Sequence, residues 1–233
     1  MSTDARPTVS ATVHDRLRAE ILSGRLGVGD PIPSERALAE QHSVNRHAVR
    51  EAVKRLQQAG LVAVSQGGAT VVRDWRRTAG LDLLGSWPLL AADSGDGVIL
   101  RDALEMRASI GIDVVRRCAQ RAGAVERAEV AVRAAALAPD VVGDLEGTHE
   151  RYIAFWDAVI DGADNLAYRL AYNSLIGAVG EIGAGAAHLF AREMADVTTF
   201  EALTTAVVEG DAEAAARAAD ALLSPTANEA GAA

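Results

Sequence analysis

Apolar residues recur at helical spacing along the N-terminal part of the chain. Val13, Leu17 and Ile21 fall on one face of a predicted first helix, which stops at a Ser-Gly pair. A turn-rich loop, GVGDPIP at 27–33, follows this helix. Ser34 then offers a favourable N-cap for a short second helix, because its hydroxyl can accept a hydrogen bond from an early backbone N–H.

A third helix is predicted to begin after Asn45, which is placed as its N-cap, and to end at Gly60. One arc of this helix is apolar and carries Ala48, Val49, Ala52, Val53 and Leu56. The opposite arc is basic and carries Arg46, His47, Arg50 and Lys54. The apolar arc must pack on the first two helices, so the basic arc and the positive end of the helix dipole face an anionic surface.

The next stretch, LVAVSQGGATVVRD at 61–74, consists of two β-branched runs on either side of a Gln-Gly-Gly tip, which is a hairpin signal. Three short helices followed by a two-stranded wing make a winged helix-turn-helix, in which the third helix enters the major groove of DNA. The alternative is a salt-bridged helix on an ordinary helical protein. We predict that residues 1–74 form a DNA-binding domain.

The remainder of the chain carries no alternating strand pattern. After a linker at 75–80, helical periodicities cover 98–121, 124–136, 144–161, 166–182, 187–208 and 212–223. The breaks between them fall at Gly-, Pro- and Asp-rich segments. We therefore predict a mainly α fold, with an all-helical bundle over 81–224 and a disordered tail over 225–233.

Charge separates the same two parts. The net charge is −9, yet residues 1–77 hold 12 basic against 8 acidic side chains, and residues 78–233 hold 11 against 24. A basic segment joined to an acidic one suggests two domains with different partners. The N-terminal residues lack the apolar core of a signal peptide and no run of about 18 apolar residues follows, so a cytoplasmic location is expected.

Enzymatic chemistry finds little support in the sequence. Cys118, flanked by two arginines, is the single cysteine, and no general base stands at a suggestive spacing from it. The chain contains no GxSxG or Walker A motif, and no GxGxxG follows a predicted strand. We expect neither an enzyme nor a bound cofactor.

The string PSERALAEQHSVNRHAVREAVKRLQQAGLVAVSQGGATVV resembles the DNA-binding domain of the GntR family of regulators. The matching features are PSER, V-x-R-x-x-VREA and a glycine-rich wing ending in T-x-V. The resemblance implies a dimer that binds a palindromic operator. The DNA contacts that it implies are Arg36, Asn45, Arg46, His47, Arg50, Gln66 and Gly67. His47 stands where the family more often has a small hydroxyl residue, so a different operator preference is expected.

A purely helical second domain resembles the FadR branch of that family. Most such domains bind a metal through one Asp and three His side chains. By alignment, the positions of these four metal ligands are occupied in this chain by Tyr152, Trp156, Phe200 and Leu222. None of these side chains ligates a metal in the usual way, so no metal is expected. The two histidines of this domain, His149 and His188, are expected to be structural. An apolar pocket suits an acyl chain, and the resemblance implies a long-chain acyl-CoA effector.

Arg107 occupies the place of an arginine that faces the effector's anionic group in related domains. If buried, it needs an anionic partner, and an ion pair with Asp102, Glu105 or another carboxylate is the alternative. Asn173 is expected to be a hydrogen-bond donor in the pocket. The resemblance thus implies the effector site Arg107, Tyr152, Trp156, Asn173, Phe200 and Leu222. A filled core without a pocket, a small-carboxylate effector and a ligand-free regulator stay open as alternatives.

Overall fold

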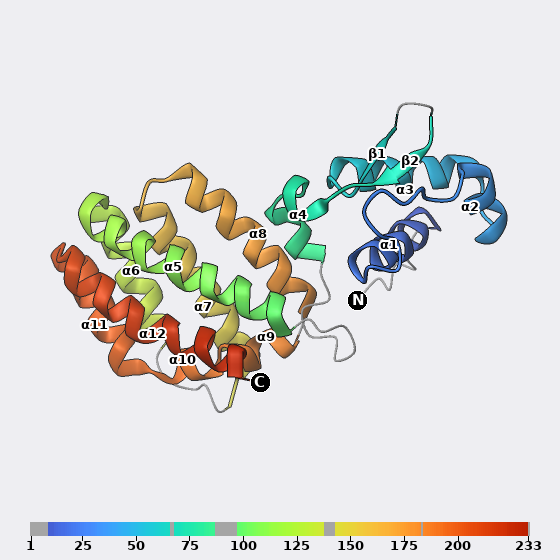
Figure 1. Cartoon of the computed structure of the whole chain (residues 1–233). Helices are drawn as coiled ribbons and strands as arrows, with labels where there is room; N and C mark the ends of the chain where they lie inside the picture. The colour runs from blue at the N-terminus through green and yellow to red at the C-terminus, as the bar shows by residue number, and fades with distance from the viewer. Residues whose placement is uncertain (1–8, 66–67, 87–96, 138–142, 183, 233) are drawn as a thin grey trace. The chain divides into compact units, whose positions relative to one another are not determined.

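The computed structural model describes residues 9–65, 68–86, 97–137, 143–182 and 184–232 (Figure 1). The chain forms two compact units, Met1–Leu83 and Leu84–Ala233. Each unit has a core of its own and is described separately below.

The first unit contains the three predicted helices and the wing. The helices are α1 (Val9–Leu22), α2 (Glu35–Gln41) and α3 (Arg46–Gln58). Ser34 caps α2 by accepting a hydrogen bond from Ala37 N, and Asn45 caps α3 by accepting one from Ala48 N at 2.8 Å. The apolar arc of α3 is buried, as the sequence pattern predicted, and packs against α1 and α2.

The wing is an antiparallel pair of short strands, β1 (Val62–Val64) and β2 (Thr70–Val72). Val62 lies opposite Val72, and both side chains are buried. Pro31 forms a bridge to Val71, which ties the loop before α2 to strand β2. Gln66 and Gly67 of the predicted hairpin tip lie outside the described residues.

Residues 75–80, the predicted linker, lie within the first compact unit. The linker residues form a helical turn, α4 (Trp75–Thr78), followed by the 3-10 helix η1 (Leu81–Ser86). The Thr78 hydroxyl donates a hydrogen bond to Gly60 O at 2.7 Å. Gly60 has a φ of +73°, and a Cβ on it would lie 2.4 Å from Thr78 O. Only glycine permits this turn and this approach, so the linker packs against the end of α3.

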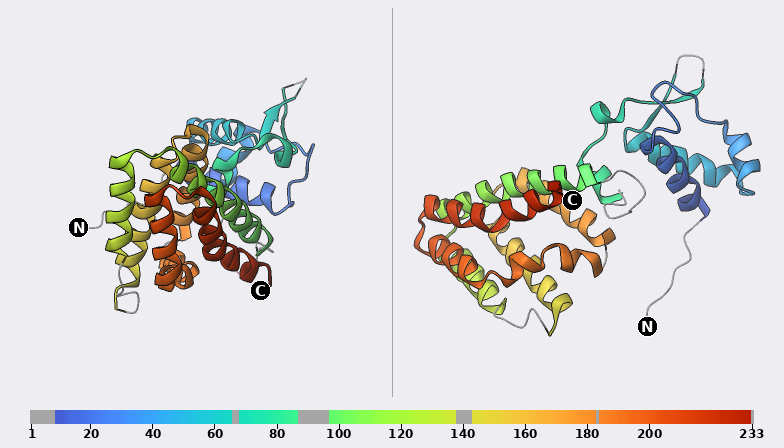
Figure 2. Two further views of the ribbon diagram at one scale, coloured as in Figure 1. Left: turned by 90° about the vertical axis from the view of Figure 1, so that its left-hand side faces the viewer. Right: turned by 60° about the horizontal axis from the view of Figure 1, so that its bottom comes forward.

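The second unit is a helical bundle, which confirms the predicted fold class. Its helices are α5 (Gly97–Arg121), α6 (Ala124–Ala136), α7 (Leu145–Gly162), α8 (Leu166–Ile182), α9 (Ala184–Leu189), α10 (Ala191–Ala195), α11 (Val197–Glu209) and α12 (Ala212–Ala232). The two long helices α5 and α12 pack side by side (Figure 2), and α11, α6 and α7 complete the core. Aromatic rings pack in this core, where Phe155 and Phe200 lie edge to face with their ring centroids 5.2 Å apart.

The helix predicted over 187–208 is divided into three pieces. Phe190 leaves the helical course between α9 and α10, and its ring is buried. Asp196 ends α10 and caps α11, because its carboxylate accepts a hydrogen bond from Thr199 N at 3.0 Å. The prediction was wrong here because the apolar periodicity continues across both breaks.

The predicted tail at 225–233 is helical through Ala232, so the prediction of disorder there was also wrong. Pro225 lies inside α12, where proline ordinarily interrupts a helix. Thr226 and Ala227 directly after it are buried. Tertiary packing of this last segment therefore outweighs its unfavourable local sequence.

Candidate functional site

The first two turns of α3 present basic side chains to solvent. Arg46, His47 and Arg50 are all exposed. The side chain of Arg46 makes no hydrogen bond or ion pair with the described part of the chain. Arg50 lies 3.4 Å from a Glu35 oxygen, and its side chain is 62% exposed. Exposed ion pairs of this kind contribute about 0–1 kcal/mol, so a DNA phosphate can compete for the guanidinium.

Two further residues of the predicted DNA surface also form local contacts. Arg36 pairs with Glu40 one turn later on α2 at 3.1 Å, again on the exposed surface. The side-chain oxygen of Asn45 caps α3, which leaves its NH₂ group available as a donor. All described residues of the predicted DNA surface are therefore exposed on the winged unit, either on α2 or at the N-terminal end of α3.

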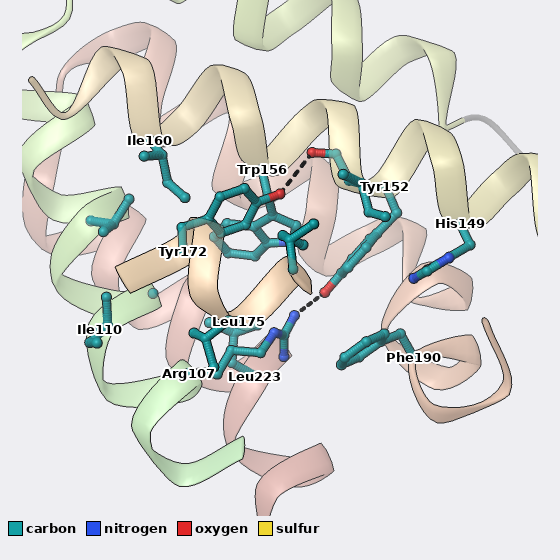
Figure 3. A pocket seen from close by; sticks show the side chains of 14 residues that line it. Arg107, Ile110, His149, Tyr152, Trp156, Ile160, Tyr172, Leu175, Phe190 and Leu223 are labelled. Carbon is teal, nitrogen blue, oxygen red and sulfur yellow. Dashed lines mark hydrogen bonds between the residues drawn. The ribbon is translucent and has the colours of Figure 1, made fainter. Parts of the chain in front are cut away.

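The second unit contains a cavity with a volume of about 50 Å³. Helices α5, α7 and α8 form most of its wall, together with Phe190 and Leu223 (Figure 3). The lining is mostly aliphatic and aromatic; it consists of Arg107, Ile110, Gly111, Val114, His149, Tyr152, Ile153, Trp156, Ile160, Tyr172, Leu175, Ile176, Phe190 and Leu223. A volume of this size holds a few water molecules or a short aliphatic segment.

Helix periodicity explains how α7 supplies its part of the wall. Asp144 starts the helix by accepting a hydrogen bond from Gly147 N at 2.9 Å. His149, Tyr152 and Trp156 then follow at intervals of three and four residues, which places them on one face. Tyr172 reaches across from α8 and donates a hydrogen bond to Ile153 O at 3.1 Å (Figure 3).

Arg107 is the one cationic side chain among the described residues of the wall, and Glu193 neutralises it. The two groups form a bidentate pair with N–O distances of 2.9 and 2.8 Å. The Tyr152 hydroxyl accepts a hydrogen bond from Arg107 and donates one to Glu193. Glu193 is 1% exposed and is not among the residues of the cavity wall, so it neutralises Arg107 without itself lining the cavity.

Burial and charge shift the ionisation of this cluster in opposite directions. Burial alone would lower the pKa of Arg107, but the attraction of Glu193 and the contact with Tyr152 outweigh it and raise the pKa. Burial raises the pKa of Tyr152 well above its usual value, although Arg107 opposes the shift. Arg107 is therefore protonated, and the phenol of Tyr152 is neutral.

Two polar atoms near the cavity lack a hydrogen-bond partner within the described chain. They are Nε2 of His149 and the indole Nε1 of Trp156, and both atoms are buried. Trp156 as a whole is 5% exposed. Burial lowers the pKa of His149, and the charge of Arg107 adds to this effect. An unpaired buried donor costs about 1–3 kcal/mol, which makes these atoms candidates for contact with a ligand.

The structure places the six predicted effector residues in three environments. Arg107, Tyr152 and Trp156 line the cavity. Phe200 and Leu222 are buried in the hydrophobic core but do not line the cavity.

Asn173 is exposed on α8 and does not reach the cavity, so its predicted place in the pocket was wrong. Its neighbour Tyr172 lines the wall instead, since one residue along a helix turns the side chain by about 100°. The sequence also missed Phe190 and Glu193. Of the alternatives considered for Arg107, the structure supports an ion pair with another carboxylate.

No metal centre or membrane span is found within the described ranges. No group of three or more His, Cys, Asp or Glu side chains there is arranged to hold a metal ion. Over the same residues, none of the helices combines the length and apolarity that crossing a bilayer requires. Burial raises the pKa of the Cys118 thiol to about 11, which keeps it in its unreactive protonated form.

Family comparisons agree with both units. Residues 9–72 match the model of bacterial regulatory proteins of the gntR family, and residues 102–224 match the FCD domain. The chain belongs to the GntR family. HTH-type transcriptional regulator Mce2R of Mycobacterium tuberculosis is 36% identical over 220 residues, which cover 94% of this chain and 90% of that protein.

More distant relatives extend the comparison. The fatty acid metabolism regulator protein of Vibrio cholerae is 32% identical over 90 residues, 39% of this chain and 32% of that protein. The solved structure of Lar, described as controlling the agr system of Listeria monocytogenes, shares the fold. Its TM-score is 0.56 at 16% identity, over 98% of this chain and 99% of that one. This GntR protein is thus a DNA-binding transcriptional regulator with a ligand-binding FCD domain, in a family of regulators and not of enzymes.

Proposed function

We propose that this GntR regulator binds a palindromic operator as a homodimer through the start of α3 and the wing. The DNA surface would consist of Arg36, Asn45, Arg46, His47, Arg50, Gln66 and Gly67. Arg46 and Arg50 are the candidates for contact with guanine edges, and Arg36 is a candidate for phosphate or base. The exposure of Arg46 and its lack of an ion pair within the described chain support this assignment.

The effector proposed for the FCD domain is an acyl-CoA thioester, and its binding would release the protein from DNA. The observation that supports it is the wall of the cavity, which is largely apolar and whose cation is already neutralised. An acyl chain matches this chemistry, because the charges of coenzyme A lie far from the chain. A long chain exceeds about 50 Å³, so its entry requires α5, α7 and α8 to move apart.

The alternative effector is a small carboxylate bound directly by Arg107. This ligand would have to share the guanidinium with Glu193, which already occupies one hydrogen on each terminal nitrogen. Under either proposal, the ligand changes DNA affinity only by its differential affinity for the DNA-bound and free forms. Such coupling is typically about 1–3 kcal/mol.

Fluorescence anisotropy with DNA from upstream of the protein's own gene tests the proposal. Binding would be measured alone and with butyryl-, octanoyl- and palmitoyl-CoA, with free coenzyme A and citrate as controls. We expect acyl-CoA to weaken operator binding by about five- to a hundredfold, and neither control to do so. Release by citrate would favour the small carboxylate, and tight binding indifferent to every compound would contradict the effector assignment.

A further inference from the structure

The pairing of Arg107 with Glu193 has a consequence for which ligands the cavity can accept. An arginine on a cavity wall ordinarily attracts anions. Here a carboxylate of the same chain, 1% exposed and not among the residues of the cavity wall, neutralises it. Tyr152 binds both groups at once, which fixes the pair in place. The charge that the cavity presents is therefore close to zero.

We propose that Glu193 is a specificity-determining residue that makes the FCD cavity reject carboxylates and accept uncharged ligands. The ligand class is an aliphatic chain with a neutral polar end, such as an alcohol, an ester or a thioester. This inference rests on the proposed function in one respect, that the cavity of Arg107 is the effector site.

Electrostatics gives the direction of the effect. A carboxylate that enters the cavity gives up its hydration, and the attraction of Arg107 that could offset this loss is largely cancelled by the buried charge of Glu193. A neutral ligand has no such desolvation penalty. Its polar end could instead meet the unpaired Nε2 of His149 or Nε1 of Trp156, after a small adjustment of the wall.

The test compares two probes with the same number of carbons, neutral 1-hexanol and negatively charged hexanoate, at about pH 7.5, where a carboxylic acid is ionised. The full-length protein is labelled with ¹⁵N, and the indole N–H signal of Trp156 is followed by NMR during each titration. A Trp156→Phe variant assigns that signal among the three tryptophans of the chain. The wild type should bind hexanol about tenfold or more tightly than hexanoate.

The decisive variant is Glu193→Gln, which removes the negative charge and keeps the size of the side chain. We expect its affinity for hexanoate to rise about tenfold or more, because Arg107 then lacks a counter-charge. Its affinity for hexanol should change by less than about threefold, since that ligand carries no charge. Glu209→Gln, which alters an exposed glutamate at the end of α11 that does not line the cavity, is the matched control and should leave both affinities unchanged.

A double variant, Arg107→Gln with Glu193→Gln, guards against misfolding of the single one, because it leaves no unpaired charge. The double variant should still bind hexanol more tightly than hexanoate, and its affinity for hexanoate should not exceed that of the wild type. Equal binding of the two probes by the wild type, an unchanged ratio in Glu193→Gln, or no response of Trp156 to either probe would each overturn the inference. Operator release by acyl-CoA is measured in a separate assay. If that assay fails, the NMR titrations still show whether Glu193 determines the charge preference of the cavity.

Discussion

The two units of the molecule use the same chemistry, an arginine paired with a glutamate, in opposite ways. In the winged unit, Arg50 and Glu35 lie on the surface, 62% and 39% exposed, with a single contact at 3.4 Å. In the FCD domain, Arg107 and Glu193 are 17% and 1% exposed and make a bidentate contact. The exposed pair can open when an anion arrives. The buried pair has little water available to replace either partner, so its two charges stay paired and neutralise each other in the cavity wall.

The difference shows that a contact's environment, more than its type, determines its role. Breaking a surface pair exposes two charges to water that already solvates them. Breaking a buried pair leaves one charge stranded in a medium that solvates it poorly.

Replacing Glu193 by Ala should lower the free energy of unfolding by about 3–5 kcal/mol, because Arg107 would lose its buried counter-charge. Urea unfolding followed by circular dichroism measures this change. Glu40→Ala, which breaks the exposed pair with Arg36, is the matched control and should change stability by less than about 1 kcal/mol. Similar losses in the two variants would show that burial does not distinguish the pairs.

Replacing Arg46 by Ala should weaken specific operator binding by about 1–3 kcal/mol and relax the preference at one operator position. Anisotropy titrations with operator and with random DNA measure the effect. Arg133→Ala removes an exposed arginine of the FCD domain and serves as a control for net charge. Equal weakening on both DNAs would assign Arg46 to phosphate contact alone.

Acidification should destabilise the FCD domain through His149. Burial lowers the pKa of this side chain in the folded state, whereas in the unfolded chain it is about 6.5. The unfolded state therefore binds more protons, and stability present above pH of about 6.5 is lost as the pH falls toward the folded pKa. Unfolding free energies between about pH 7 and 5 should fall more steeply for the wild type than for His149→Gln. Identical slopes would contradict this assignment.

The smallest effect on stability is expected for Glu35→Gln, within about 1 kcal/mol, because the pair that it breaks is exposed. DNA binding should become slightly tighter and more salt-dependent, because Arg50 no longer has to leave the Glu35 carboxylate in order to contact a DNA phosphate. Anisotropy titrations over a range of salt concentrations would detect the change. A large loss of stability would mean that the surface pair behaves like the buried one.

The fold was largely predictable from the sequence because its signals are local. The basic and apolar arcs of α3, the cap at Asn45 and the two β-branched runs each lie within a few residues of one another. The family resemblance rested on the same stretch. The ends of elements were harder, since α12 continues through Pro225 owing to tertiary packing that no local pattern encodes.

The cavity was only partly predictable, because its decisive contact is distant in sequence. Arg107 and Glu193 are 86 residues apart, and the break at Phe190 that precedes Glu193 carried no helix-stop signal. Nearby carboxylates such as Asp102 were more obvious partners, yet Asp102 pairs with Arg101. Three of the residues predicted by alignment line the wall, while Asn173 lies one position after Tyr172, which lines it.

The hydrogen bond between Thr78 and Gly60 bears on where the DNA-binding domain ends as a folding unit. The gntR family match stops at residue 72, but the compact unit continues to Leu83, a buried residue. The recognisable domain is therefore shorter than the part of the chain that supports it. A fragment cut at the edge of the motif would lack the residues that close the far end of α3. Transplanting this DNA-binding module onto another sensor should accordingly carry the chain through Leu83.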